Sequence, residues 1–130
     1  MNQSWIVEEL NTSEEKIVAK AKSKETKDYL HTLKPAGQML ADSDRETFVY
    51  LLEDEEAFAH LRFTTSTWET LAAHREQENE VVLVLEHDDG NVEITLDQFW
   101  AEIGYLVENI KGNNNYGEDM VQAVENMFFK

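Results

Sequence analysis

The pattern of apolar and polar residues is clearest in the last third of the chain, where it predicts two amphipathic helices. Over residues 99–110, apolar side chains recur at the three- and four-residue spacing of a helix with one buried stripe. Lys111 and Gly112 follow, a pair that favours a helix C-terminus. Residues 118–128 repeat the apolar spacing after an acidic start. We therefore predict two long C-terminal helices joined by a short Asn-rich connection.

Ahead of these helices the pattern predicts a β-hairpin. Residues 81–85 form a continuous apolar run, which is typical of a strand buried on both faces. Residues 92–96 alternate apolar and polar side chains, as expected for a strand with one face in water. The Asp- and Gly-rich residues 88–91 between them favour a tight turn.

A second hairpin and a short helix are predicted in the middle of the chain. Residues 47–52 and 58–63 are rich in β-formers and flank the acidic turn at 53–56. We expect a helix from about residue 67 to 77, because Ser66 and the Glu three residues later fit a capping box.

The N-terminal part predicts a separate small hairpin. Residues 5–7 and 17–19 are short β-prone runs on either side of a polar turn. The only proline, Pro35, is followed by Ala-Gly and is the best internal boundary. We predict one domain over the whole chain, with a hairpin in residues 1–34 joined to a larger body in residues 35–130.

These elements together predict the α+β class. We expect an antiparallel sheet of about five to seven strands, with the two long helices and the short helix packed mainly on one face. Residues 48–68 and 81–100 share the order strand, acidic turn, strand, helix start and Trp. They are interpreted either as two ββα units on that sheet or as convergent use of the same simple elements.

The charge narrows the classes of partner. The 27 Asp and Glu residues outnumber the 11 Lys and Arg residues, for a formal net charge of −16. Residues 1–34 hold six lysines and six acids, so the whole excess lies in residues 35–130. Such a surface repels nucleic-acid phosphates and anionic lipids, and it favours a protein partner with a basic surface. The start of the chain has no export signal and no apolar run is long enough for a membrane span, so we expect a cytoplasmic protein.

Candidate chemistry is sparse. The chain has no cysteine, which excludes disulfides and thiolate metal sites, and no phosphate-binding or catalytic motif. The acidic residues 42–44 and 87–89 are interpreted as solvated turns, because the calcium-loop pattern fails after residue 44. Glycines 112 and 117 are interpreted as helix caps. We predict no enzyme activity, no cofactor and no metal site.

One surface patch is a candidate interaction site, and its members are aromatic or cationic: Tyr50, Phe58, His60, Arg62 and Tyr116. In a strand, Phe58, His60 and Arg62 share one face. If this face is uncovered, it is a mixed aromatic and cationic contact surface. The alternative is that the N-terminal hairpin covers it.

Two segments carry a resemblance to a known family. Residues 105–120, which include the Asn-rich run, and residues 40–44 resemble a family of small acidic proteins from bacilli that carries only an uncharacterised-protein-family label. The similarity extends over about residues 33–129. The resemblance implies a cytoplasmic bacterial protein, and it brings no activity, cofactor or catalytic residue.

The sequence therefore leads to a small protein-interaction or regulatory module that acts through its anionic surface. Two alternatives stay open: an acidic mimic of nucleic acid, and a small-molecule binder or enzyme with a site between sheet and helices. In the latter case Tyr50, His60, Arg62 and Tyr116 would be the first residues to inspect. A homodimer formed through the apolar residues 127–129 is a further alternative.

Overall fold

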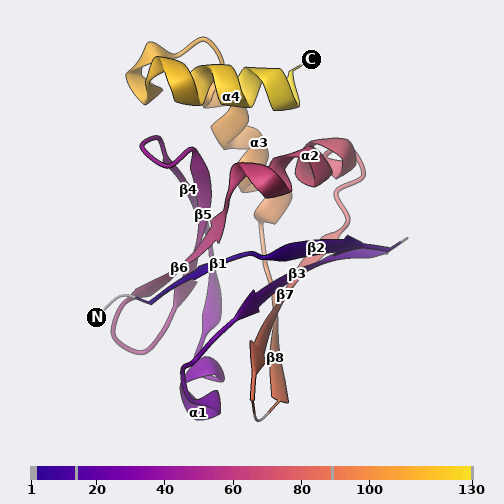
Figure 1. Ribbon diagram of the computed structural model, residues 1–130, viewed down its shortest axis with the longest axis vertical. Coiled ribbons are helices and arrows are strands. Elements are labelled where there is room, and N and C mark those ends of the chain that lie inside the picture. The colour runs from indigo at the N-terminus through magenta and orange to yellow at the C-terminus, as the bar shows by residue number, and fades with distance from the viewer. Residues whose placement is uncertain (1–2, 14, 89, 130) are drawn as a thin grey trace.

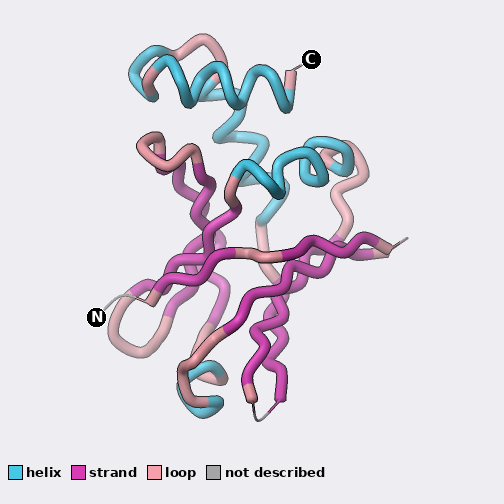
Figure 2. The backbone as a smooth tube through the Cα atoms, in the orientation of Figure 1, coloured by secondary structure: helices cyan, strands magenta, loops and turns pink. Residues whose placement is uncertain are grey.

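The structure is a computed structural model that describes residues 3–13, 15–88 and 90–129. Its strands are β1 (Ser4–Ile6), β2 (Glu9–Thr12), β3 (Lys16–Lys22), β4 (Lys34–Asp42), β5 (Thr47–Glu53), β6 (Phe58–Phe63), β7 (Glu80–His87) and β8 (Gly90–Thr95). Its helices are α1 (Lys27–Leu30), α2 (Thr65–His74), α3 (Phe99–Ile110), the 3₁₀ helix η1 (Asn114–Tyr116) and α4 (Glu118–Phe128). The predicted α+β class is confirmed (Figures 1 and 2).

The predicted single antiparallel sheet is wrong, because the strands form two mixed sheets. Sheet A has the order β1-β6-β5-β4, and sheet B has the order β2-β3-β7-β8. In each sheet a strand from the first 22 residues pairs in parallel with a much later one, β1 with β6 and β3 with β7. Local apolar patterns do not report which distant strands will pair, so they did not predict this topology.

The N-terminal segment passes from one sheet to the other at two consecutive residues. The Val7 N–H donates to the Arg62 carbonyl of sheet A at 2.9 Å, and the Glu8 N–H donates to the Lys20 carbonyl of sheet B at 2.8 Å. Within the described part of residues 1–34, only β2 and β3 pair as antiparallel strands. The hairpin expected in residues 1–34 is therefore present only in part, since β1 belongs to the other sheet.

Pro35 lies inside a strand and not at a boundary. β4 continues through it, with a register shift between Pro35 and Met39. Gly37 has a φ of +69° in this irregular stretch, a conformation that glycine adopts without strain. The strand tolerates the proline because β4 is at the edge of sheet A, where a missing N–H donor costs little.

Helices α2, α3 and α4 gather at one end of the β structure, and α1 lies at the other end (Figure 1). α2 begins at Thr65, so the predicted capping box at Ser66 is wrong; Thr64 is the N-cap, and the Thr67 hydroxyl donates to its carbonyl at 2.7 Å.

The two ββα units occur in the predicted order, but they do not share one sheet. In sheet A, the N-terminal strand β1 lies beside β6, the second strand of the unit. In sheet B, the N-terminal strand β3 lies beside β7, the first strand of the unit.

The core fills the space between the inner faces of the sheets and the helices. Each inner face is formed by alternate residues of its strands; Leu61 of β6 and Leu83 of β7 are fully buried. An aromatic cluster joins the helices to sheet A: the ring centroids of Phe48 and Trp68 are 4.7 Å apart, and Phe128 lies 6.0 and 5.9 Å from them. The outer faces of the two sheets therefore point away from the core.

Candidate functional site

The outer face of sheet A is the candidate functional site. Along β6, Ala59, Leu61 and Phe63 are fully buried in the core. The alternate residues Phe58, His60 and Arg62 therefore point away from it, as expected from the strand period. β1 pairs beside β6 as a neighbouring strand. The N-terminal segment extends this face sideways and does not cover it, so the covered alternative is wrong.

Register places residues of all four strands in rows across this face. Leu40, Val49, Arg62 and Ile6 form one row, from β4 to β1. Leu51, His60 and Ser4 are partners in the next row. We define the sheet A outer face by these rows together with the exposed ring at the start of β6: Ser4, Ile6, Leu40, Val49, Leu51, Phe58, His60 and Arg62.

This face is the most apolar exposed surface of the described chain. Four large hydrophobic side chains are exposed among the described residues, and three belong to this face: Ile6, Leu40 and Phe58, with 55%, 52% and 42% exposure. Val49 and Leu51 are buried but belong to no part of the main core, so they form the floor of the face. An apolar group of this kind, rimmed by polar residues, is typical of an interaction surface.

A fixed polar unit lies beside the apolar residues. Arg62 Nη1 donates to Asp42 Oδ2 at 3.0 Å, and Arg62 Nε donates to Ser4 Oγ at 3.1 Å. Burial raises the pKa of Asp42, but the hydrogen bonds and charges of Arg62 and Arg45 outweigh it and lower the pKa overall. The guanidinium is thereby held between β4 and β1, and it is not a loose cation.

A shallow depression of about 300 Å³ lies next to this unit. Leu40, Val49, His60 and Arg62 line it together with the β4–β5 turn. Asp42, which the sequence placed in a possible cation-binding fragment, is one of its walls and is engaged by Arg62. The depression continues the sheet A outer face toward that turn.

Acidic turns lie at both ends of β5. At one end, Asp44 is exposed in the β4–β5 turn; at the other end, Glu53, Glu55 and Glu56 are exposed. Asp54 has a structural role: the Tyr29 hydroxyl donates to it at 2.6 Å, and the backbone N–H groups of Glu56 and Ala57 also donate to it. The Tyr29 hydrogen bond is the main reason why the pKa of Asp54 is lowered.

Two members of the predicted patch do not join the site. Tyr50 is fully buried on the inner face, where its hydroxyl donates to the Asp97 carbonyl at 2.6 Å and burial raises its pKa to about 12. Tyr116 lies in η1 and packs against the core.

The structure brings together Phe58, His60 and Arg62. Ile6 and Leu40 were not predicted, because their place on this face depends on long-range strand pairing, which no local sequence pattern reports.

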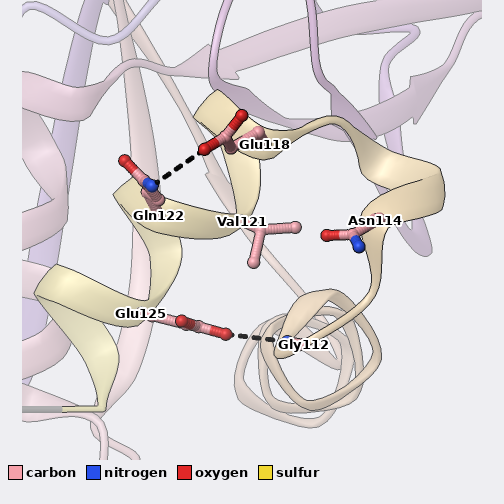
Figure 3. Close-up of a pocket in the computed structure, with 6 residues that line it drawn as sticks. All are labelled: Gly112, Asn114, Glu118, Val121, Gln122 and Glu125. Carbon is pink, nitrogen blue, oxygen red and sulfur yellow. Dashed lines mark hydrogen bonds between the residues drawn. The ribbon is translucent and has the colours of Figure 1, made fainter.

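A second hollow, of about 600 Å³, lies between α4 and the connection from α3 (Figure 3). Its polar groups already serve the fold: Glu125 accepts from the Gly112 N–H at 2.7 Å, and Glu118 accepts from Gln122 at 3.4 Å. Gly112 has a φ of +67° just after α3, and Gly117 is the N-cap of α4. Both glycines are helix caps, as predicted.

The third acidic fragment singled out in the sequence is only partly within the structure. Asp89 lies outside the described residues. His87 and Asp88 line a hollow of about 540 Å³ together with Lys22, Ser23 and Lys24. Ser23 Oγ accepts from the Glu25 N–H at 3.1 Å, so this buried hydroxyl is satisfied within the chain.

The apolar C-terminal end is used within the chain. Phe128 packs on Phe48 and Trp68. Phe129 lies under two cations, with Arg75 Cζ 5.4 Å and Lys111 Nζ 4.6 Å from its ring centroid. The rings that suggested a homodimer in the sequence thus have intramolecular partners. Within the described part of the chain, no helix is long and apolar enough to cross a membrane.

The fold and this surface define a small, strongly acidic α+β protein with one exposed apolar sheet face. Comparison with known sequences then places it: the model of UPF0738, a family of unknown function, matches residues 5–128, so the chain belongs to that family. This confirms the resemblance to an uncharacterised family from bacilli.

Three relatives illustrate the family. A UPF0738 protein of Halalkalibacterium halodurans is 40% identical over 128 residues, which is 98% of each chain. One from Bacillus licheniformis is 44% identical over 95 residues, 73% of this chain and 75% of its own. One from Staphylococcus aureus is 40% identical over 103 residues, 79% and 82% of the two chains. No solved structure matches this chain.

Proposed function

We propose that this protein is a small cytoplasmic protein-binding module, not an enzyme, and that it contacts a partner with a basic surface through the sheet A outer face. One observation carries the proposal. Three of the four large hydrophobic side chains exposed in the described chain gather on this one face, around Val49 and Leu51. Exposed apolar area costs free energy in water, and covering it with a partner recovers that energy.

Charge supports a basic partner. With −16 on a chain of 130 residues, a cationic surface is attracted from a distance and docks faster than a neutral one. A second copy of this chain would bring the same net charge and would be repelled. The acidic turns at the two ends of β5 place part of that charge next to the apolar residues.

The arrangement favours binding over catalysis. The four residues considered for a small-molecule site are separated, since Tyr50 faces the core and Tyr116 lies in η1. Arg62 is engaged by Asp42 and Ser4, and Asp54 by Tyr29 and two backbone N–H groups. These hydrogen bonds hold the fold together, and they already occupy both groups.

In-cell photo-crosslinking tests the proposal. A benzoylphenylalanine is placed at position 58 in the sheet A outer face, or at position 105, where Tyr105 of α3, which is 68% exposed against 42% for Phe58, is the control. We expect position 58, and not position 105, to crosslink to one protein whose crosslinked surface is rich in Lys and Arg.

The purified partner must then bind the full chain with an affinity that falls with added salt and drops at least tenfold in Phe58→Ser. Tyr105→Ser should bind like the unchanged chain. Crosslinking to a second copy of this chain, to an acidic partner, or equally from both positions would contradict the proposal.

A further inference from the structure

The two edges of sheet A are poorly suited to receive a strand. β1 has only three residues, which is too short for stable strand addition. β4 at the other edge is interrupted between Pro35 and Met39, and the Met39 N–H is already bound by Glu102 Oε1 of α3 at 3.0 Å. A partner that contacts sheet A must therefore lie on its face, where side chains and not backbone groups are offered.

The apolar residues on that face lie in two directions: one set lies in the row that crosses the strands at Val49, and the other lies along β5. Val49 and Leu51 form a low floor along this strand, and the more exposed Leu40 and Ile6 stand at the two ends of the row that contains Val49. β5 has seven residues, so it spans about 23 Å between its two turns, with the floor of Val49 and Leu51 in its middle. An α-helix of about 15 residues has the same length, and a helix with one apolar stripe presents its side chains to such a surface.

Both ends of this line are acidic. Asp44 and Glu46 lie in the β4–β5 turn, with Arg45 as the one base between them. Glu53, Glu55 and Glu56 lie at the other end, where Lys34 is the register partner of Glu53. Acids therefore exceed bases at each end, while Arg62 in the middle is paired with Asp42.

We propose that the partner segment is an amphipathic helix of about 15 residues, with an apolar stripe that covers the sheet A outer face and with Lys or Arg at both of its ends. This inference rests on the proposed function and specifies the shape and charge pattern of what binds. The apolar stripe covers Val49, Leu51, Leu40 and Ile6. The terminal cations lie over the two acidic turns, about 20 Å apart.

The test uses two synthetic 15-residue peptides of identical composition. One has leucines at helical i, i+3, i+4, i+7 spacing and two lysines at each end; the other has the same residues in scrambled order. Each is titrated into the ¹⁵N-labelled full chain, and amide chemical shifts are followed by NMR. The expected result is that the striped peptide shifts the amides around Leu40, Leu51 and Phe58 and binds at least tenfold more tightly than the scrambled one.

Matched variants locate the contact. Leu40→Ser and Phe58→Ser should weaken the striped peptide at least tenfold, while Tyr105→Ser leaves it unchanged. Glu55→Lys combined with Glu56→Lys should weaken it and reduce its salt dependence. Unfolding curves of every variant check that the fold is retained.

Equal binding of the two peptides, shifts that map to another surface, or no binding at millimolar peptide would each overturn the helix proposal. The crosslinking result separates this failure from failure of the proposed function. A Lys- and Arg-rich protein captured at position 58 would still support protein binding, by a segment of another shape.

Discussion

The two sheets have the same kind of interior but different exteriors. Each has four strands with one parallel and two antiparallel pairs, and each buries one face in the common core. On the outer face of sheet B, the lysines of β3 have acidic neighbours in register: Lys16 pairs with Glu80, Lys20 with Glu9 and Lys22 with Glu86. The sheet A outer face also has charged partners, Arg62 with Asp42 and Lys34 with Glu53. It differs because three large hydrophobic side chains are exposed beside them: Ile6, Leu40 and Phe58.

The difference separates the apolar residues that stabilise the fold from those that stay exposed on its surface. Cross-strand neighbours of opposite charge make the exterior of sheet B compatible with water without a partner. The inner faces account for the hydrophobic driving force of folding. Apolar residues on the outside of sheet A contribute little to that core, and the proposed partner would cover them.

The largest expected effect tests the equivalence of the interiors. Leu61→Ala in sheet A and Leu83→Ala in sheet B should each lower the free energy of unfolding by about 2–5 kcal/mol, because both side chains are fully buried. Urea unfolding followed by circular dichroism measures this. If only one of them destabilised the protein, the two sheets would not share one core.

A smaller effect on stability is expected at high pH, and it concerns Tyr50 of sheet A. Tyr50→Phe removes the hydrogen bond to the Asp97 carbonyl and should cost about 1 kcal/mol near neutral pH. Burial raises the pKa of Tyr50 from 10.0 to about 12, so the folded state favours the protonated phenol. Its contribution is complete below pH 10 and is lost as the pH rises toward 12.

Thermal unfolding across this pH range should therefore show a weaker decline for Tyr50→Phe than for the unchanged chain. Tyr29→Phe should act in the same direction, since the pKa of Tyr29 is also raised by burial and by Asp54. The strands of sheet B contain no tyrosine. An unchanged alkaline decline in Tyr50→Phe would mean that this buried phenol does not titrate with unfolding.

The Arg62–Asp42 pair should contribute about 1 kcal/mol or less, because it is partly exposed to solvent. The pKa of Asp42 is lowered from 3.8, so its contribution is present above pH 3.8 and is lost as the pH falls below that value. Arg62→Ala should lose stability at pH 7 and show less acid dependence. Lys22→Ala on sheet B is the matched control, and we expect a change within about 0.5 kcal/mol. A larger loss in the control would contradict the special status of Arg62.

The smallest effects compare the two exteriors directly. Phe58→Ser should change the free energy of unfolding by less than about 0.5 kcal/mol, since the ring lies outside the core. Lys20→Glu places a second acid opposite Glu9 and should destabilise the protein by about 0.5 kcal/mol. Equilibrium unfolding of both variants at low and high salt measures this. Strong destabilisation by Phe58→Ser would show that the ring serves the fold.

Much of the local structure could be predicted from the sequence. The apolar stripes of α3 and α4, the β5–β6 and β7–β8 hairpins and the glycine caps follow from periods of 3.6 and 2 and from turn chemistry. The division into two sheets could not be predicted, because the parallel pairing of β1 with β6 joins residues far apart in the chain. α1 spans only four residues, too few for an amphipathic pattern.

The candidate site was half predictable for the same reason. Alternation along β6 placed Phe58, His60 and Arg62 on one face. The inward direction of Tyr50 could not be predicted, because nearly every residue of β5 is apolar and no alternation marks the buried face. Ile6 joined the face only through the parallel register of β1 with β6.

The parallel pairings have a consequence for synthesis on the ribosome. β1 cannot form its parallel pair until the region of His60 has been synthesised, because Ser4 is the register partner of His60. In the same way, β3 needs the region of Glu80, the register partner of Lys16. β1 therefore lacks its parallel partner for about the first half of translation, and β3 lacks its own for about the first two-thirds. Long-range closure of this kind slows folding. Lys16, Lys20 and Lys22 keep β3 charged during this time, and charged residues of this kind disfavour aggregation of an unpaired strand.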